Sequence, residues 1–438
     1  MQQNWGIIGG GIMGMTLAHR LSQEGHKVTL FEAAADFGGL ASAWKIDDFI
    51  WDKFYHVILL SDLRTRSILK EIDLESQINW VETKTGFYTD GQLYSMSNTF
   101  EFLKFPPLNL IDKFRLGLTI FVASKLKNRK RLEQIPVSEW LKKWSGNSTF
   151  NKIWLPLLRA KLGDHYQKTS AAFIWTTIQR MYAARRTGLK QEMFGYVSGG
   201  YAQIIESLKN KLTAEGVVLK TSHEALEIKS GIDHRPIVTF ANAHSETFDN
   251  IIVTLPSDIA SNVCKDLTNE EKIALKKYEY LGIICASVVL NESISPYYVT
   301  NITDMWVPFT GIIEMSALVD KKYLGDKALI YLPKYLSSND GLFEASDDEI
   351  KKVFLSSLKR MYPKFSDSDI KFIGIARAKR VLALPTLNYS EQLPDIKTSM
   401  AGVYILNASH ITDGTLNVNE TINIAEIKLD EILKTLNC

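Results

Sequence analysis

Three glycines near the start of the chain have the spacing of a phosphate-binding turn. Residues 9–14 read Gly-Gly-Gly-Ile-Met-Gly, and Glu32 follows at a distance typical of the acidic residue in this motif. In a G-x-G-x-x-G turn the first glycine, Gly9, allows a tight bend, Gly11 lets backbone N–H groups approach a pyrophosphate, and Gly14 permits close packing of a helix on a strand. A carboxylate at Glu32 accepts hydrogen bonds from ribose hydroxyls and repels a 2′-phosphate. The pattern therefore predicts a dinucleotide site and disfavours NADP.

The elements that must position this turn follow one another in the required order. The apolar run at residues 5–8 predicts a strand, residues 15–24 have the apolar spacing of a helix, and residues 27–31 predict a second strand. The start of such a helix offers partial positive charge to phosphates. Together these elements predict a βαβ unit that could hold NAD or FAD, with a purely structural glycine turn as the alternative.

A second glycine turn, Gly38-Gly39, decides between the two cofactors in favour of FAD. The E-x5-G-G spacing from Glu32 resembles the flavin-dependent amine oxidase, protoporphyrinogen oxidase and phytoene desaturase superfamily, in which this turn continues the FAD site. The resemblance implies cofactor contacts from Gly9, Gly11, Ile12, Met13, Gly14, Glu32, Ala33, Gly38, Gly39, Leu40 and Ala41.

Further segments resemble the same superfamily and occur in its order. Residues 195–201 are similar to the turn before the helix that returns the chain to the FAD domain, and Ala225 matches a position whose backbone faces adenine. Residues 402–420 resemble the C-terminal FAD motif, which implies cofactor contacts from Asn407, Ala408 and Asn417. The usual Gly-Asp of this motif is absent, but neutral side chains of the Asn407-Ala408-Ser409 segment can still form hydrogen bonds.

The resemblance covers nearly the whole chain and implies an α/β fold. The expected fold consists of a Rossmann-like FAD-binding domain and an inserted α+β substrate domain, in which helices cover a mixed sheet. Helical spacing prevails at residues 100–193, and strand patterns occur at residues 283–290, 311–318 and 328–332. We expect the FAD domain to comprise residues 1–80, 191–260 and 390–438, and the substrate domain to comprise residues 81–190 and 261–389.

Three residues are the candidates for catalysis. His56 lies in a segment that resembles the histidine-bearing loop beside the isoalloxazine in UDP-galactopyranose mutase and its relatives, although a lone histidine can also be a structural hydrogen-bonding residue. Glu314 interrupts an apolar run, and an inward carboxylate needs a partner. Arg377, in a strand that the family directs toward the flavin, is the expected partner. Substrate contact is expected from Arg159, Arg180 and Tyr196, each of which could instead be a solvated or packed side chain.

Two kinds of flavin chemistry compete in this interpretation. The leading hypothesis is an FAD-dependent oxidoreductase in which hydride passes from a small-molecule substrate to the flavin. The alternative is a non-redox flavoenzyme similar to UDP-galactopyranose mutase, in which Arg159, Lys161, Arg180 and Arg185 would bind a diphosphate. A third possibility is a binding protein that has lost the cofactor. The substrate has no short sequence code.

Composition narrows the set of partners. The 51 basic and 49 acidic residues nearly cancel, so no nucleic-acid partner is expected. The three cysteines, Cys264, Cys285 and Cys438, lack metal-ligand spacing, which predicts no metal and a reducing, cytoplasmic location. An apolar run at residues 116–123 precedes basic residues 125–131 and could touch a membrane surface, but we expect a buried helix whose cations complement its dipole.

Overall fold

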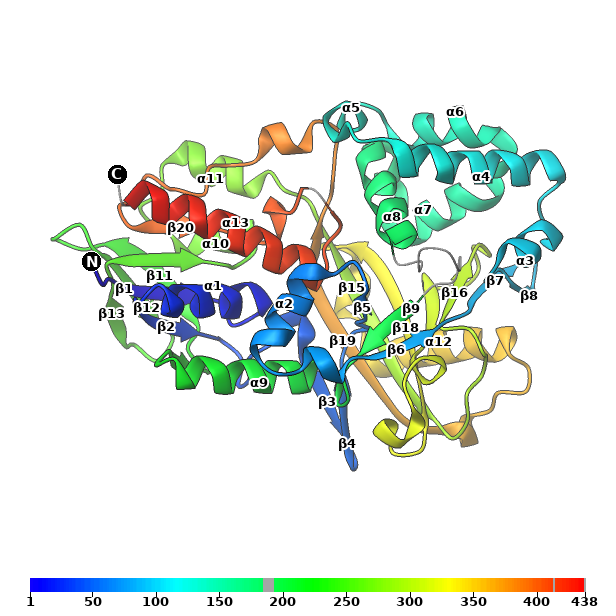
Figure 1. The fold of residues 1–438 in the computed structure, drawn as a ribbon, viewed down its shortest axis with the longest axis horizontal. Helices are drawn as coiled ribbons and strands as arrows, with labels where there is room; N and C mark the ends of the chain where they lie inside the picture. Colours follow the sequence, from blue (N-terminus) through cyan, green and yellow to red (C-terminus); the bar gives the residue numbers. More distant parts are fainter. Residues whose placement is uncertain (184–192, 413, 437–438) are drawn as a thin grey trace.

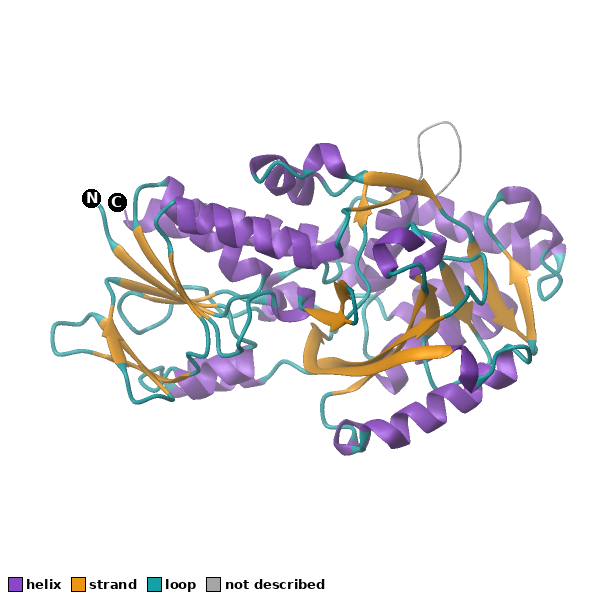
Figure 2. Ribbon diagram, turned by 90° about the horizontal axis from the view of Figure 1, so that it is seen from below, coloured by secondary structure: helices purple, strands orange, loops and turns teal. Residues whose placement is uncertain are grey.

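The molecule has two halves, each built around its own sheet. The structure is a computed structural model that describes residues 1–183, 193–412 and 414–436. Figure 1 shows that the chain begins in one half, returns to it at residues 200–276 after a first passage through the other half, and returns again for its last helix. Figure 2 shows the strands gathered in two places, one in each half.

The first half contains a five-stranded parallel sheet, which confirms the Rossmann-like prediction. Strand β1 (Asn4–Ile8) lies at its centre between β2 (Lys27–Phe31) and β14 (Asn250–Val253), with β10 (Val218–Lys220) and β20 (Val403–Ile405) at the edges. Four of the five residues of β1 and all of β14 are buried, as expected for parallel strands covered on both faces.

Helices cover one face of this sheet and a small sheet covers the other. Helices α1 (Ile12–Gln23), α9 (Gly200–Ala214) and α13 (Val418–Leu436) share one apolar core with the sheet. The antiparallel strands β11 (Ala225–Ser230), β12 (Pro236–Phe240) and β13 (Ser245–Thr247), with α10 (Ser257–Val263), share a second core. Helix α11 (Asn269–Lys276) packs on α10.

The second half contains a seven-stranded mixed sheet, as the α+β prediction requires. Its order is β19 (Ile370–Ala383), β15 (Tyr280–Leu290), β18 (Ala328–Ser337), β17 (Gly311–Glu314), β16 (Val299–Ile302), β7 (Thr85–Thr89) and β8 (Gln92–Ser95). The pair β16 and β7 is parallel and the other pairs are antiparallel. Helix α12 (Asp347–Met361) packs on one face. The strand expected at residues 311–318 ends at Glu314, where a 3-10 turn begins.

A layer of helices lies beside this sheet. Its members are α3 (Thr99–Lys104), α4 (Leu110–Lys125), α5 (Arg129–Glu133), α6 (Val137–Thr149), α7 (Leu155–Leu162) and α8 (Ala171–Ala183). The expectation of a buried helix at residues 116–123 is only half correct. Leu116 and Ala123 are buried in α4, but Phe121 on the other side of the helix is 58% exposed. In the described part of the chain, no helix has the length and hydropathy needed to cross a membrane.

Short elements join the two halves. The hairpin of β3 (Ala43–Ile46) and β4 (Phe49–Asp52) follows the second glycine turn, and α2 (Leu63–Glu71) packs against α13. Strands β5 (Ile58–Leu59), β9 (Met193–Tyr196) and β6 (Asn79–Glu82) form a three-stranded sheet. The loop between β4 and β5, which carries His56, therefore lies at the junction.

Candidate functional site

Packing requires glycine at two positions of the first turn. Gly9 has a φ of 113°, and a Cβ atom there would lie 2.3 Å from Oγ1 of Thr254. A Cβ atom on Gly14 would lie 1.9 Å from the carbonyl oxygen of Gly9, because the first turn of α1 rests on the end of β1. Any larger residue at Gly14 would therefore push the helix off the strand.

Gly11 differs from these two glycines because its surroundings are open. A Cβ atom on Gly11 would meet no atom within 4 Å. Gly11 is the N-cap of α1 and provides no side chain to cap the helix, so the first N–H groups of α1 remain available. Ile12 and Met13, which follow it, line the same cavity as Gly11. This end of the helix can therefore receive an anionic group.

The second glycine turn is bound to the first. The N–H of Gly38 donates to the carbonyl oxygen of Gly10 at 2.9 Å, and Gly38 and Gly39 have φ values of 123° and 56°. A Cβ atom on Gly39 would lie 3.4 Å from Cα of Gly11. The two turns thus form one continuous glycine surface, and Leu40 and Ala41 extend it along the cavity.

Glu32 is held in place by backbone donors. Its two carboxylate oxygens accept hydrogen bonds from N–H of Gly10 at 2.8 Å and from N–H of Ala34 at 2.9 Å. It lines the cavity at the end of β2, whereas its neighbour Ala33 is exposed and does not. A carboxylate fixed in this way retains lone pairs for ribose hydroxyls.

A cavity of about 570 Å³ runs from these turns to the mixed sheet. Its wall beside the turns also includes Thr254, Leu255 and Pro256, which follow β14. Its far wall is mainly apolar and aromatic, formed by Phe54, Tyr55, Phe194, Tyr201, Tyr280, Ile283, Tyr298, Ile313 and Tyr335. The open glycine surface, the free helix N-terminus and Glu32 fit the ADP half of FAD, and the aromatic end is suited to a flat ring system.

The C-terminal motif also reaches the cavity. Asn407 and Ala408 line the cavity, but the Asn407 amide donates to Leu255 O at 2.8 Å and its oxygen accepts from Ser409 N at 3.0 Å. Asn417 caps α13 by accepting from Glu420 N at 3.0 Å. The Asn407 amide therefore holds the turn together at the wall of the cavity, and the cofactor contacts of Asn407, Ala408 and Asn417 stay predictions.

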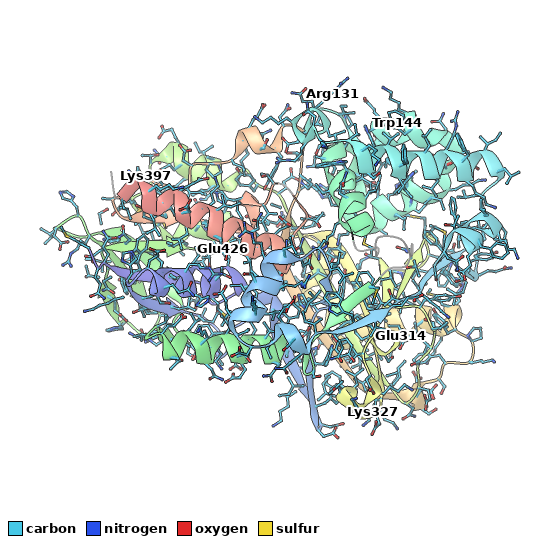
Figure 3. The ribbon with its side chains drawn as sticks, in the orientation of Figure 1. Arg131, Trp144, Glu314, Lys327, Lys397 and Glu426 are labelled. Atoms are coloured by element: carbon cyan, nitrogen blue, oxygen red, sulfur yellow. The ribbon has the colours of Figure 1, made fainter. Side chains whose placement is uncertain are left out.

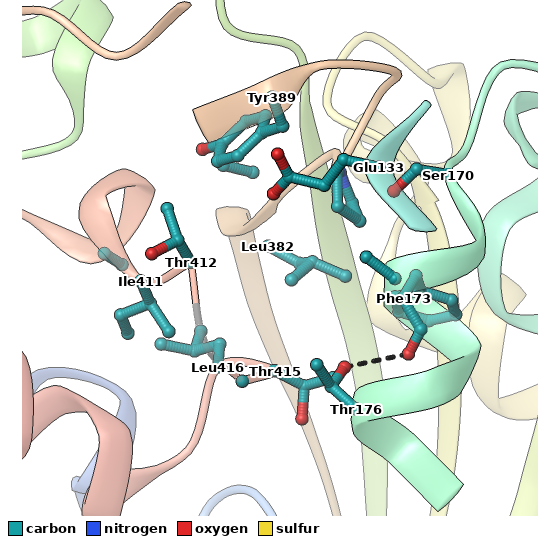
Figure 4. A pocket seen from close by; sticks show the side chains of 15 residues that line it. Glu133, Ser170, Phe173, Thr176, Leu382, Tyr389, Ile411, Thr412, Thr415 and Leu416 are labelled. Carbon is teal, nitrogen blue, oxygen red and sulfur yellow. Dashed lines mark hydrogen bonds between the residues drawn. The ribbon is translucent and has the colours of Figure 1, made fainter. Parts of the chain in front are cut away.

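A second, much smaller cavity lies beside the loop that follows Ala408 (Figure 4). Its volume is about 30 Å³, which suits about one water molecule. Thr415 and Leu416 line both cavities, and Glu133 faces the smaller one, where it accepts a hydrogen bond from Ser390 Oγ at 2.5 Å. This space is too small for a substrate.

His56 lines the main cavity and is positioned by two neighbours. Its Nδ1 lies 3.5 Å from Oδ2 of Asp52, and its ring centroid lies 4.8 Å from that of Tyr201. Asp52 is buried, and its other oxygen accepts from the backbone N–H of Tyr201, at the start of α9, at 2.8 Å. Burial raises the pKa of Asp52, while His56 and the backbone donors act in the opposite direction. The pair can hold a proton next to the cavity.

Lys161 lies beside the aromatic side chains of the far wall. Its Nζ lies 3.2 Å from the ring centroid of Tyr335, whose hydroxyl is 2.9 Å from that of Tyr55. None of the described acidic residues pairs with Lys161, and burial lowers its pKa to about 7. A neutral amine in this place can accept a proton or a hydrogen bond from a ligand.

Two arginines line the cavity with their charges already balanced. Arg180 Nη2 lies 3.2 Å from Asp62 Oδ2, and burial raises the pKa of Asp62 while Arg180 acts to lower it. Arg380 pairs with Asp258 at 2.6 Å. Neither guanidinium is an unpaired site for a diphosphate.

The expected pair of Glu314 and Arg377 does not form, so this prediction is wrong. Glu314, fully buried, accepts from Ile294 N at 3.2 Å and from the Ser316 hydroxyl (Figure 3 shows its position among the strands). Arg377 pairs with Asp347 at 2.5 Å. Strands β15 and β18 separate the two residues, and neither lines the cavity.

Glu314 instead gives a testable pH dependence. Burial raises the pKa of its carboxyl from 4.5 to about 7, against opposing hydrogen bonds from Ser316 and Ile294. Because the folded state then binds this proton more tightly than the unfolded chain, stability falls as the pH rises from about 4.5 to about 7. The total loss is about 3 kcal/mol. Below pH ~4.5 the free energy of unfolding of Glu314→Gln in urea should equal that of the wild type. Above pH ~7 the variant should have the larger free energy of unfolding. The exposed control Glu270→Gln should show the same dependence of unfolding free energy on pH as the wild type. If Glu314→Gln also showed the wild-type dependence on pH, this account of Glu314 would be contradicted.

Three other expected contacts also lie outside the cavity. Arg159 is exposed on α7, where its guanidinium lies 5.9 Å from the ring centroid of Tyr166. The Tyr196 hydroxyl accepts from Asp320 N at 3.2 Å, and Ala225 is buried in β11. Arg185 lies outside the described residues.

Sequence reasoning missed several residues of the aromatic wall. Tyr335 lies in β18 and Tyr298 directly precedes β16, and the pairing of the strands of the mixed sheet brings both residues to the cavity. Asp62, which directly precedes α2, also lines the cavity. No local motif marks them. The only sign of such a wall in the sequence was an aromatic content of 11%, and this content does not tell whether an aromatic residue lines a pocket or packs in the core.

The geometry defines a flavin-type nucleotide site on a Rossmann-like sheet. The chain belongs to the family described as flavin containing amine oxidoreductase, whose model matches residues 12–375. This match confirms the resemblance to the amine oxidase superfamily and, together with the fit of the site, identifies FAD as the cofactor.

Individual relatives are distant. Zeta-carotene desaturase of Synechocystis sp. is 23% identical over 250 residues, which cover 52% of this chain and 50% of the relative. The chain spans about half the length of the curated relatives it matches. Among solved structures, a candidate protoporphyrinogen oxidase from Exiguobacterium sp. 255-15 has a TM-score of 0.77 at 17% identity, with 99% of each chain covered. Reduced UDP-galactopyranose mutase has a TM-score of 0.74 at 16% identity, with coverage of 99% and 96%. These two likenesses concern the fold.

Proposed function

We propose that the protein oxidises a flat, largely apolar organic substrate by hydride transfer to FAD. The observation that carries this proposal is the continuity of the main cavity. The same space runs from the glycine turns, which fit the nucleotide, to a wall that includes Tyr55, Tyr298 and Tyr335. When bound, the flavin supplies the hydride acceptor.

The residues of the chain act by binding, orientation and exclusion of water. The aromatic side chains of the far wall offer flat surfaces to a substrate and keep the site dry. Lys161 and His56 lie in that wall and can hold or receive the proton that the substrate loses with its hydride. Arg180 and Arg380, each paired with an aspartate, line the cavity at other points.

Two observations favour an apolar substrate over a nucleotide sugar. Arg180 and Arg380 are balanced by aspartates, and Arg159 lies outside the cavity, so the described arginines do not form a diphosphate site. The desaturase name of one sequence relative adds support for a polyene or a similar molecule. The mutase reaction remains the second candidate because of the fold likeness alone.

The test begins with the absorption spectrum of the purified protein and continues with anaerobic titration. We expect flavin bands, and we expect zeta-carotene or protoporphyrinogen in detergent to bleach them, whereas putrescine should not. Bleaching by putrescine alone would overturn the apolar class. If the reduced protein instead interconverts two isomers of UDP-galactose without net oxidation of the flavin, the mutase reaction is favoured. A protein that neither contains nor takes up FAD would exclude both.

A further inference from the structure

The outer surface of α3 and α4 exposes an unusual concentration of large apolar side chains. Their exposed fractions range from 53% to 77%. We call this surface the α3–α4 face, and its members are Phe100, Leu103, Leu110, Ile111, Phe114 and Phe121. Single exposed apolar residues are ordinary, but a contiguous group marks a surface that binds something.

Helical geometry places the α4 members on one side of the helix. Leu110, Phe114 and Phe121 are separated by one and two helical turns, so they project along the same stripe. The opposite side of α4 is already packed, because Leu116, Thr119 and Ala123 are buried. Helix α4 is therefore apolar on two sides, and packing inside the molecule covers only one.

Positive charge surrounds the α3–α4 face. Lys104 Nζ lies 4.0 Å from the ring centroid of Phe100, and Lys125 Nζ lies 5.7 Å from that of Phe121. Further exposed cations follow α4 at Lys127, Lys130 and Arg131, the last of which is labelled at the edge of the molecule in Figure 3.

Helices α3 and α4 carry two acidic residues, Glu101 and Asp112, which are fewer than the five exposed cations Lys104, Lys125, Lys127, Lys130 and Arg131. Glu101 accepts from Ser95 Oγ and Ser97 N, and Asp112 is buried against Ser148 and Thr149. The face therefore combines apolar rings with an excess of cations, two of which lie over those rings.

We propose that the α3–α4 face docks on the surface of a membrane that contains anionic lipids. Apolar side chains enter the boundary between headgroups and acyl chains, and lysine and arginine heads meet the lipid phosphates. The excess positive charge argues against a second copy of the same chain as the occupant, because two such faces would repel each other. Figure 1 shows α3 at the edge of the second half and α4 in the layer of helices next to it. The inference rests on this surface alone and does not depend on the reaction.

The experiment uses the full-length protein with its flavin and two kinds of vesicle. We expect co-sedimentation with vesicles of phosphatidylcholine and phosphatidylglycerol in equal parts, weaker binding to pure phosphatidylcholine, and loss of binding as salt is raised. The double variant Phe114→Ala/Phe121→Ala should bind the mixed vesicles roughly tenfold more weakly or worse. The matched control is Ile273→Ala on α11, which removes an equally exposed side chain far from the face.

A second variant separates binding from folding. A Cβ atom on Gly117, in the middle of the α4 stripe, would meet no atom within 4 Å. Gly117→Glu therefore adds a carboxylate to the face without a clash, and glutamate also favours helix. We expect a melting temperature at least as high as that of the wild type and strongly reduced vesicle binding. The proposal is overturned if wild-type protein ignores anionic vesicles, if the variants bind as well as wild type, or if the double variant turns a dimer into a monomer.

Discussion

Gly11→Val is expected to give a folded protein that does not retain FAD. The valine Cβ meets no protein atom, and the φ of −77° at this position suits valine, so the turn itself can form. The side chain instead fills the open space above the helix N-terminus, where the pyrophosphate must approach the backbone. We expect FAD to bind at least about a hundredfold more weakly, measured by flavin fluorescence during titration of the apoprotein.

Two other glycines serve as controls for this prediction. Gly341, at the start of a 3-10 turn remote from the cavity, also has open space around its added Cβ, and Gly341→Val should retain FAD. Gly14→Ala should fail differently, through loss of the fold, because its Cβ would collide with Gly9 O. Normal FAD affinity in Gly11→Val would show that the pyrophosphate does not lie at this turn.

Asp52→Ala is expected to lower the free energy of unfolding by about 3 kcal/mol. The substitution removes the acceptor for the buried N–H of Tyr201 and the carboxylate beside His56. Asp52→Asn keeps an oxygen in place and should cost much less. Urea unfolding of the two variants, with the exposed Asp48→Ala as control, measures the difference.

Equal losses for alanine and asparagine would contradict this account of Asp52. In that case the negative charge, and not the hydrogen bond to α9, would be what the fold requires. The flavin spectrum adds a second readout, because displacement of His56 at the cavity wall should shift the absorption bands of bound FAD.

The sequence identified the nucleotide half well because its signals are local. Strand, glycine turn, helix and second strand all lie between Asn4 and Phe31, and the close packing of Gly14 involves an atom of Gly9 in the same motif. The pairing of Glu314 with Arg377 could not be judged in this way. It depends on the order of strands in the mixed sheet, which puts two other strands between them.

Helix α4 shows a different limit of periodicity. Both of its sides carry apolar residues, such as Ala123 on the packed side and Phe121 on the exposed side, so the pattern alone predicts burial all round. Which side is covered depends on the number of neighbouring helices. In the same way, Tyr335 reaches the cavity through strand pairing over long distances in the chain, which no short motif records.

The parallel sheet of the first half also sets an order of events during synthesis. Its central strand, β1, precedes the other strands of the sheet in the chain, but its neighbour β14 begins only at Asn250 and the edge strand β20 only at Val403. Asn407, Ala408 and Asn417, which complete the cavity, belong to this last segment. The lining of the cavity is therefore complete only when the segment that carries Asn417 has left the ribosome, so the full FAD site forms long after the glycine turns have been made.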